Sequence, residues 1–237
     1  MSQGLAISQD GEGVITVDIA RPPDNAFTVD MCRELAQLLA SPPPGARLLR
    51  LRGEPGVFCR GREPSGPGAA AARATVEALT EATRLLAMTD LVTVAEVDGE
   101  AAGFGVGLVG QCDVAVASTR SRFWFPEVNH GLAPALVLSW LPRLIGRRQA
   151  FWLTATATPL SATEALRLGL VNSVCEPAEL GARVDQMIST LLSFPAEIQA
   201  EIKRDLRDFG EVDQAVAYRM AQDRLLLASV INESSTH

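Results

Sequence analysis

The strongest candidate for acid–base chemistry is Glu127, which ends the segment Phe-Trp-Phe-Pro-Glu. Aromatic neighbours keep water away from a carboxyl group, and this desolvation raises its pKa towards the working range of a general base. A Pro-Glu pair is also typical of a helix start, where the carboxylate accepts backbone N–H bonds, so the local residues leave both interpretations open. His130 follows three residues later and would share a helical face with Glu127, although a surface or packing role is the simpler interpretation.

Four other carboxylates lie in the preceding segment: Glu96, Asp98, Glu100 and Asp113. Surface or turn roles explain the first three most simply. A replacement second carboxylate at Glu96 or Asp98 is the alternative. Asp113 stands at the start of a predicted strand, for which we expect a structural role.

A glycine-rich turn separates these carboxylates, and its residues 105–110 form a G-x-G-x-x-G string. A dinucleotide site needs a strand directly before this string and a full helix after it. Here the preceding strand ends too early and the next strand begins too soon, which argues against a nucleotide. Gly103 and Gly105 instead permit a sharp turn that opens a helix with unpaired N–H groups. Such donors can stabilise an oxyanion on a substrate, and a tight turn packed on the core is the alternative.

Elements that position these residues can be predicted from hydrophobic spacing. Strands and helices alternate in the first half of the chain, and helices dominate after about residue 134. Thr28 is the expected N-cap of one helix, and a second helix is expected over 69–88. The predicted strands cover residues 14–20, 46–53, 91–97, 112–118, 121–125 and 170–174. This order predicts a layered α/β fold with a helical C-terminal extension, and 237 residues fit one large domain or one domain with an appendage.

Composition excludes several classes of function. The net charge of −7 and a pI of about 5.0 argue against a nucleic-acid surface, which needs clustered cations. No apolar run reaches the roughly 18 residues of a membrane span, and the first residues lack the pattern of a signal peptide. The four cysteines are irregularly spaced and form no zinc pattern, so we expect reduced thiols, no metal and a cytoplasmic location.

Several linked motifs resemble the crotonase (enoyl-CoA hydratase/isomerase) superfamily. The central match is VAEVDGEAAGFGVGLVGQCDVAVAS, followed by SRFWFPEVNHGLAP. Three flanking segments are similar to the same family in the same order: RPPDNAF (21–27), GVFCRGRE (56–63) and LSATEALRLGLVNSV (160–174). The resemblance covers about residues 14–205, which is most of the chain.

This resemblance implies a crotonase-like spiral of ββα units over residues 1–180 and a helical oligomerisation region over 181–237. It implies assembly as a homotrimer or a dimer of trimers. It also implies an acyl-CoA thioester as the small-molecule substrate, with no further cofactor and no nucleic-acid or membrane partner. The backbone N–H groups of Arg62 and Phe104 match the family's oxyanion hole, and Glu127 matches its catalytic glutamate.

For the CoA end of the substrate, the resemblance points to the loop that holds Asn25 and Ala26, to Arg60 and to Lys203. Lys203 is the only lysine in the chain, and a lysine often meets a CoA phosphate at this family position. A solvated surface cation is the alternative interpretation.

The sequence departs from the family at two places. The first glutamate of the family's hydratases falls on Gly107, which leaves one carboxylate for the chemistry. The segment after Pro134 has Ala-Leu-Val-Leu where small residues are usual, which predicts an altered pocket floor. One glutamate suffices to move a proton between two carbons, so we expect double-bond isomerisation or hydration. The alternatives are a C–C bond-forming, decarboxylating or dehydrating enzyme of a secondary-metabolite pathway, or a CoA-binding relative without catalysis.

Overall fold

The computed structural model describes residues 4–234 and divides the chain into two compact units between Ser193 and Phe194. The first unit is a layered α/β fold, as expected, and it holds every strand of the described chain. The expected core boundary at residue 180 falls before helix α8 (Leu180–Leu192). Because Leu180, Val184 and Ile188 of this helix pack on the large sheet, α8 belongs to the first unit.

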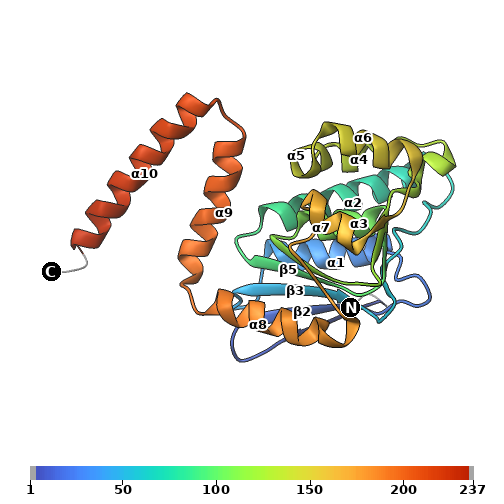
Figure 1. Ribbon diagram of the computed structural model, residues 1–237, viewed down its shortest axis with the longest axis horizontal. Coiled ribbons are helices and arrows are strands. Elements are labelled where there is room, and N and C mark those ends of the chain that lie inside the picture. Colours follow the sequence, from blue (N-terminus) through green and yellow to red (C-terminus); the bar gives the residue numbers. More distant parts are fainter. Residues whose placement is uncertain (1–3, 235–237) are drawn as a thin grey trace. The chain divides into compact units, whose positions relative to one another are not determined.

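A six-stranded sheet forms the base of the first unit, in the order β1-β2-β3-β5-β7-β10 (Figure 1). β1 and β2 pair antiparallel, and the other neighbours pair parallel. The bounds are β1 Leu5–Gln9, β2 Val14–Ile19, β3 Leu48–Gly53, β5 Val92–Val97, β7 Val114–Ser118 and β10 Ser173–Cys175. The predicted strands at 14–20, 46–53, 91–97 and 112–118 are thereby confirmed, whereas the strand expected at 170–174 is shorter and runs from Ser173 to Cys175.

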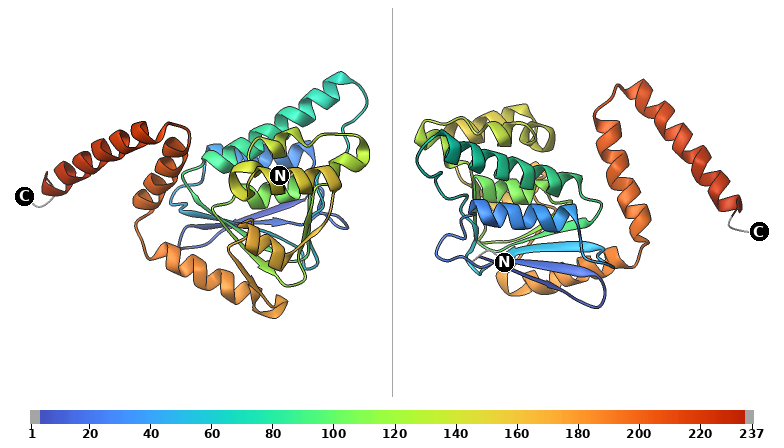
Figure 2. Two further views of the ribbon diagram at one scale, coloured as in Figure 1. Left: turned by 45° about the horizontal axis from the view of Figure 1, so that its top comes forward. Right: turned by 180° about the vertical axis from the view of Figure 1, so that it is seen from behind.

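Side chains alternate between the two faces of this sheet, as the strand geometry requires. Leu48, Val94 and Val116 face α8, and Leu49, Leu51 and Ala95 face the main core. Helices α1 (Val29–Ala40) and α2 (Ala69–Met88) lie side by side over that core (Figures 1 and 2). The expected N-cap is confirmed, because the Thr28 side chain accepts a hydrogen bond from the Met31 amide at 3.1 Å.

A second, smaller sheet has the order β4-β6-β8-β9. Its strands are β4 Val57–Cys59, β6 Glu100–Ala102, β8 Arg122–Trp124 and β9 Leu160–Ser161. Two consecutive strand pairs, β3/β4 and β5/β6, are arranged alike. In each pair the first strand lies in the large sheet, the second lies in the small sheet, and a helix follows the second strand. α2 follows β4, and α3 (Phe104–Gln111) follows β6. This repetition is the ββα spiral that the resemblance implies.

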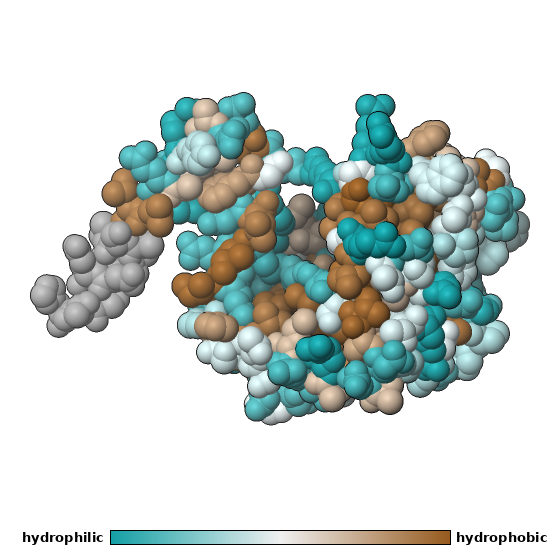
Figure 3. Space-filling view, viewed as in Figure 1, coloured by the Kyte–Doolittle hydropathy of each residue, from teal (hydrophilic) through white to brown (hydrophobic). Residues whose placement is uncertain are grey.

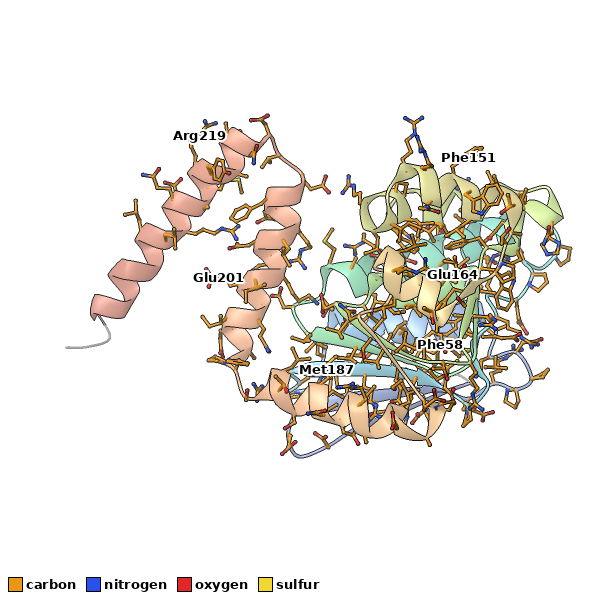
Figure 4. All side chains as sticks on the ribbon, viewed as in Figure 1. Phe58, Phe151, Glu164, Met187, Glu201 and Arg219 are labelled. Carbon is orange, nitrogen blue, oxygen red and sulfur yellow. The ribbon has the colours of Figure 1, made fainter. Side chains whose placement is uncertain are left out.

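Short helices complete the first unit after β8. They are η1 Pro126–His130, α4 Ala135–Leu138, α5 Leu141–Ile145, α6 Arg147–Thr156, α7 Ala162–Leu168 and η2 Pro177–Glu179. A capping box begins α7, since Ser161 and Glu164 bond reciprocally. Phe151 projects outward from α6 and is 71% exposed (Figure 4).

The second unit consists of α9 (Ala196–Gly210) and α10 (Gln214–Ser234). Arg224 of α10 pairs with Asp205 and Asp208 of α9 and lies over the Phe209 ring. Apolar side chains are exposed along α9 at a spacing of four residues, namely Ile198, Ile202 and Leu206 (brown in Figure 3). Neither these helices nor any other in the described residues combines the length and apolar character needed to cross a bilayer.

Candidate active site

Three neighbouring parallel strands of the small sheet end at the candidate site. The register pairs Cys59 of β4 with Ala101 of β6, and Ala102 of β6 with Trp124 of β8. Carboxyl ends of adjacent parallel strands lie about 5 Å apart. The segments that follow β4, β6 and β8 carry Arg62, Phe104 and Glu127 respectively. The sheet therefore collects the three residues expected to act on a substrate.

The Arg62 amide is positioned by a bridge to Phe27. The Phe27 amide donates to the Gly61 carbonyl at 2.9 Å, and the Glu63 amide donates to the Phe27 carbonyl at 2.9 Å. In such a parallel bridge, the N–H of the intervening residue points to the opposite side. Within the described chain, the Arg62 N–H has no protein acceptor.

The Phe104 amide opens helix α3. Gly103 precedes it with φ +49°, a backbone conformation that L side chains rarely adopt, and donates its own N–H to the Trp124 carbonyl at 2.9 Å. Phe104 is the first helical residue, and its N–H meets no protein acceptor among residues 4–234. The amides of Arg62 and Phe104 are thus both available to a ligand.

Glycines let the two donor loops approach each other closely. A Cβ on Gly105 would lie 2.9 Å from the Cys59 carbonyl carbon, so the first turn of α3 packs directly on the end of β4. A Cβ on Gly61 would lie 3.5 Å from the Ala102 carbonyl oxygen. The Phe27 and Phe104 rings meet edge to face at 5.2 Å beneath this junction. This close approach brings both N–H donors to one place, where they suit an oxyanion.

Glu127 lies directly over the start of α3. Its Oε1 is 3.0 Å from the position that a Cβ on Gly103 would occupy. Its Oε2 is buried and finds no hydrogen-bond partner in the part of the chain that the structure describes. Burial raises the pKa of the Glu127 carboxyl, and its own backbone amide and the positive charges of Arg62 and His130 partly oppose this shift. A desolvated, unpaired carboxyl group beside free N–H donors is the arrangement expected of a general base.

Gly107, the position at which the sequence lacks the second carboxylate, has open space beside it. Gly107 is buried in α3, and a Cβ there would meet no other element of the described chain within 4 Å. Glu96 and Asp98, the two candidates for a replacement carboxylate, each form an ion pair with an arginine, so that role stays a prediction for either residue. Glu96 pairs with Arg50, Asp98 with Arg120, and Glu100 with Arg60.

His130 and Asp113 occupy different surroundings. His130 ends η1, so it shares a face of this short helix with Glu127, and it is exposed at the cavity described below. Asp113 has the expected structural role, because its carboxylate accepts bonds from the Thr93 amide (2.7 Å) and hydroxyl (2.8 Å).

A cavity of about 710 Å³ opens beside the donor loops. It is lined by Ala26, Arg60, Arg62, Trp124 and His130, among others. The structure thus brings Ala26 and Arg60, two of the expected CoA contacts, to the same opening as Arg62. Arg60 already pairs with Asp24 and Glu100, and these carboxylates raise the pKa of its guanidinium.

Asn25 has a structural use in this loop. Its side chain is 1% exposed, accepts from the Arg21 amide at 2.8 Å and donates to the Val57 carbonyl at 2.8 Å. Because these contacts use both the oxygen and the nitrogen of the amide group, they favour a structural role over a direct bond to CoA. Asn25 instead ties the loop that carries Ala26 to strand β4.

The segment after Pro134 forms α4, whose Val137 is buried in the core while Leu138 is exposed. Sequence reasoning missed Trp140, just beyond it. A Cβ on Gly110 would lie 2.6 Å from Trp140 Cη2, so the indole stands directly on α3. The spacing of Gly103, Gly107 and Gly110 along one helix face was the available signal.

Lys203 lies on α9, in the second unit. Its contact with a CoA phosphate stays a prediction. Among the described residues, no group of three or more His, Cys, Asp or Glu side chains is arranged to hold a metal ion.

Comparisons with known proteins agree with this geometry. The sequence model of the enoyl-CoA hydratase/isomerase family matches residues 9–237. The chain is 30% identical over 221 residues to the probable enoyl-CoA hydratase echA6 of Mycobacterium leprae, covering 89% of this chain and 85% of that protein.

Solved structures agree as well. An enoyl-CoA hydratase of Mycobacterium smegmatis superposes with a TM-score of 0.90 at 27% identity, covering 96% of this chain and 91% of that one. A putative enoyl-CoA hydratase from Thermobifida fusca YX, solved in complex with CoA, superposes with a TM-score of 0.88 at 31% identity, covering 97% of this chain and 95% of that one. Its complex with acetoacetyl-CoA superposes with a TM-score of 0.87 at 30% identity, covering 96% of this chain and 95% of that one. The chain described here belongs to the enoyl-CoA hydratase/isomerase family.

Proposed function

We propose that the protein moves a proton on an acyl-CoA thioester and isomerises a 3-enoyl-CoA to a 2-enoyl-CoA. The observation that carries this proposal is the Glu127 carboxyl group, which lies over Gly103 with a buried and unpaired Oε2. One carboxylate is sufficient for this reaction, and Gly107 leaves the site with one.

The reaction follows from the positions of the donors and the base. The thioester oxygen accepts the N–H groups of Arg62 and Phe104. Glu127 takes a proton from C2, and the electron pair of that C–H bond moves into the thioester carbonyl to give a dienolate oxyanion. Glu127 then returns the proton to C4 while the carbonyl reforms, which leaves the double bond between C2 and C3. One oxyanion donor contributes about 3–4 kcal/mol to such a transition state.

The CoA moiety fits the 710 Å³ cavity, whose lining includes Ala26 and Arg60. Asn25 supports this binding by holding the Ala26 loop, and we propose Lys203 as a phosphate contact. Proton transfer between two carbons of one substrate needs no cofactor beyond the acyl-CoA itself.

The direct test compares the native enzyme with Glu127→Gln on 3-enoyl-CoA, 2-enoyl-CoA and malonyl-CoA. We expect 3-enoyl-CoA to be isomerised and the variant to lose on the order of 10²–10⁴ in rate while still binding CoA. Turnover of malonyl-CoA alone, or an unchanged rate in Glu127→Gln, would refute the assignment. Gln at this position keeps the shape and removes the base, so the variant separates loss of the base from loss of the fold.

Hydration of a 2-enoyl-CoA is the second candidate. The open space over Gly107 favours it, because a water molecule there would lie near Glu127. The relatives named above are called hydratases. Water would add its oxygen to C3 and its proton to C2, and Glu127 would have to serve both transfers. The 2-enoyl-CoA arm of the same assay measures this reaction.

We further propose a homotrimer or a dimer of trimers. Large apolar side chains are exposed in both units, among them Phe151 and Trp152 on α6 and Leu206 on α9. Their exposure supports burial against other copies of the chain. Light scattering of the full chain after size-exclusion chromatography should give three or six times the 25.2 kDa of one chain. A monomer mass would contradict this proposal.

A further inference from the structure

A second cavity, of about 560 Å³, lies next to the one proposed for CoA. It is walled by the start of α1, the segment 62–66 and the middle of α2. Arg21, Arg62, Glu63 and Pro64 line both cavities, so the two meet at these side chains. Its volume lies within the range of about 300–1,000 Å³ that is typical of small-molecule sites. The contacts proposed above for CoA leave this second cavity without an occupant.

Arginine and carboxylate side chains line both cavities, and all but one of them have a partner of opposite charge. Arg62 is the exception. Within residues 4–234, its guanidinium forms no ion pair, and its one hydrogen bond goes to the Glu63 carbonyl at 2.9 Å. Its side chain is exposed at the shared wall, so a ligand can reach it. The pairs formed by the other charged lining residues are Arg21–Glu63, Arg60–Asp24 and Asp30–Arg33.

The place of this uncompensated charge indicates which part of a substrate it meets. Arg62 supplies one of the two thioester donors from its backbone, so its guanidinium lies within one side-chain length of the thioester. Its charge also acts on the Glu127 carboxyl group, where it opposes the rise in pKa. The CoA phosphates are separated from the thioester by the whole pantetheine arm, which is far longer than an arginine side chain. An anionic partner for Arg62 is therefore expected on the acyl side of the thioester.

We propose that the acyl group extends into the second cavity and ends in a carboxylate that pairs with the Arg62 guanidinium. The planar guanidinium suits a carboxylate because it can donate two parallel N–H bonds to it. Val29 and Pro64 line the same cavity and offer apolar contacts to the methylene groups before the carboxylate. The substrate class is then the CoA thioester of a dicarboxylic acid rather than of a plain fatty acid.

This inference rests on the proposed function, since it places the thioester oxygen at the Arg62 and Phe104 amides. It gives Arg62 a second use, in which the backbone holds the thioester and the side chain selects the acyl group. Arg62 is thereby a specificity-determining residue as well as an oxyanion donor.

The test compares two pairs of saturated thioesters with equal carbon numbers: glutaryl-CoA with pentanoyl-CoA, and adipyl-CoA with hexanoyl-CoA. They contain no double bond to move, so calorimetry measures affinity alone. We expect the native protein to bind at least one dicarboxylic member about tenfold or more tightly than its partner, a typical effect of hydrogen bonds between charged groups. Arg62→Gln keeps the backbone N–H and removes the charge, so this preference should be lost. Arg84→Gln removes an exposed arginine of α2 that lines neither cavity, and this matched control should keep the preference.

A measurement on the native protein alone makes the test independent of the folding of any variant. Salt screens an ion pair, so the ratio of the two affinities within a pair should fall as the salt concentration rises. Equal affinity within both pairs, or a preference that survives in Arg62→Gln, would overturn the inference while acyl-CoA binding stands. An equal loss of affinity for both members in Arg62→Gln would also overturn it, because the guanidinium would then serve the CoA phosphates. Failure of all four thioesters to bind would instead refute the proposed function.

Discussion

Gly107→Glu should convert the site from one carboxylate to two. A Cβ at this position meets no other element of the described chain within 4 Å, so the substitution starts in open space. Helical side chains lean towards the N-terminus of their helix, which directs the new carboxylate towards Gly103 and Glu127. The rise between residues 103 and 107 is about 6 Å, and an extended glutamate side chain spans most of this distance.

The expected gain is in hydration. A water molecule held between Glu127 and the new carboxylate can be deprotonated by one group while the other protonates C2. A positioned acid–base group typically contributes 10²–10⁴ in rate, so we expect hydration of 2-enoyl-CoA to rise by about 10² or more. The second carboxylate also raises the pKa of Glu127 further, because two like charges in one site disfavour ionisation.

Two contributions to the free energy of unfolding can be separated here, one from the helix backbone and one from the new charge. Replacing a helix-interior glycine by alanine stabilises by about 0.5–1 kcal/mol, and Gly107→Ala should raise the Tm by about 1–4 °C. Gly107→Glu has the same stabilising effect on the helix backbone, but desolvation of the buried carboxylate opposes part of it. Its Tm should therefore lie below that of Gly107→Ala.

The assay follows loss of the enoyl thioester for the native protein, Gly107→Glu, Gly107→Gln and Gly107→Ala. Gly107→Gln has the shape of the glutamate without its charge, so it is the matched control. If folded Gly107→Glu binds acyl-CoA and hydrates no faster than Gly107→Gln, the two carboxylates do not share a water and the inferred geometry is wrong.

Four further predictions use contacts described above. Burial raises the pKa of Glu127, so turnover should fall as the pH drops through that raised value, and a kcat–pH profile with an ordinary carboxyl pKa would contradict this. The same shift means that the folded chain holds the Glu127 proton more tightly than the unfolded chain does. The protonated carboxyl therefore favours the folded state at low pH, and this contribution is lost as the pH rises through the folded pKa. Glu127→Gln should raise the Tm at neutral pH and leave it unchanged in acid. Asn25→Ala removes the bond to the Val57 carbonyl and should cost about 1–3 kcal/mol, measured by urea unfolding of the variant and the native protein. Gly110→Ala places a methyl group against the Trp140 ring and should move that ring, seen as a shifted indole N–H signal in the free protein.

Strands with clear hydrophobic alternation were predictable, and two of the three strands that build the site were not. β2, β3 and β5 contain six residues each, so their buried and exposed positions repeat often enough to be recognised. β4 and β6 contain three residues each, and no period can be read from three residues. β8 (Arg122–Trp124) is equally short, but it lies within the strand predicted over 121–125. Residues 54–68 and 98–111 therefore look like loops when taken alone. Only the resemblance to a family indicated the ββα repeats.

Among the site residues, Glu127 could be proposed from the resemblance to the family, because the aromatic segment before it left a helix-start role open. The roles of Asn25 and Trp140 could not be predicted, because each depends on a contact with a distant element. Asn25 reaches strand β4, and Trp140 reaches Gly110 of α3. The spacing of polar and apolar residues does not reveal such contacts, and for Trp140 the glycine at position 110 was the one weak signal.

Helix α3 shows why the site depends on tertiary structure. Three of its eight residues are glycines, and each costs about 1 kcal/mol of helix propensity relative to alanine. Such a helix has little stability of its own. Contacts at its N-terminus hold it, namely the Gly103 amide on the Trp124 carbonyl and Gly105 against Cys59. The same contacts place the Phe104 amide beside Glu127, so loss of helix packing and loss of the oxyanion site should occur together.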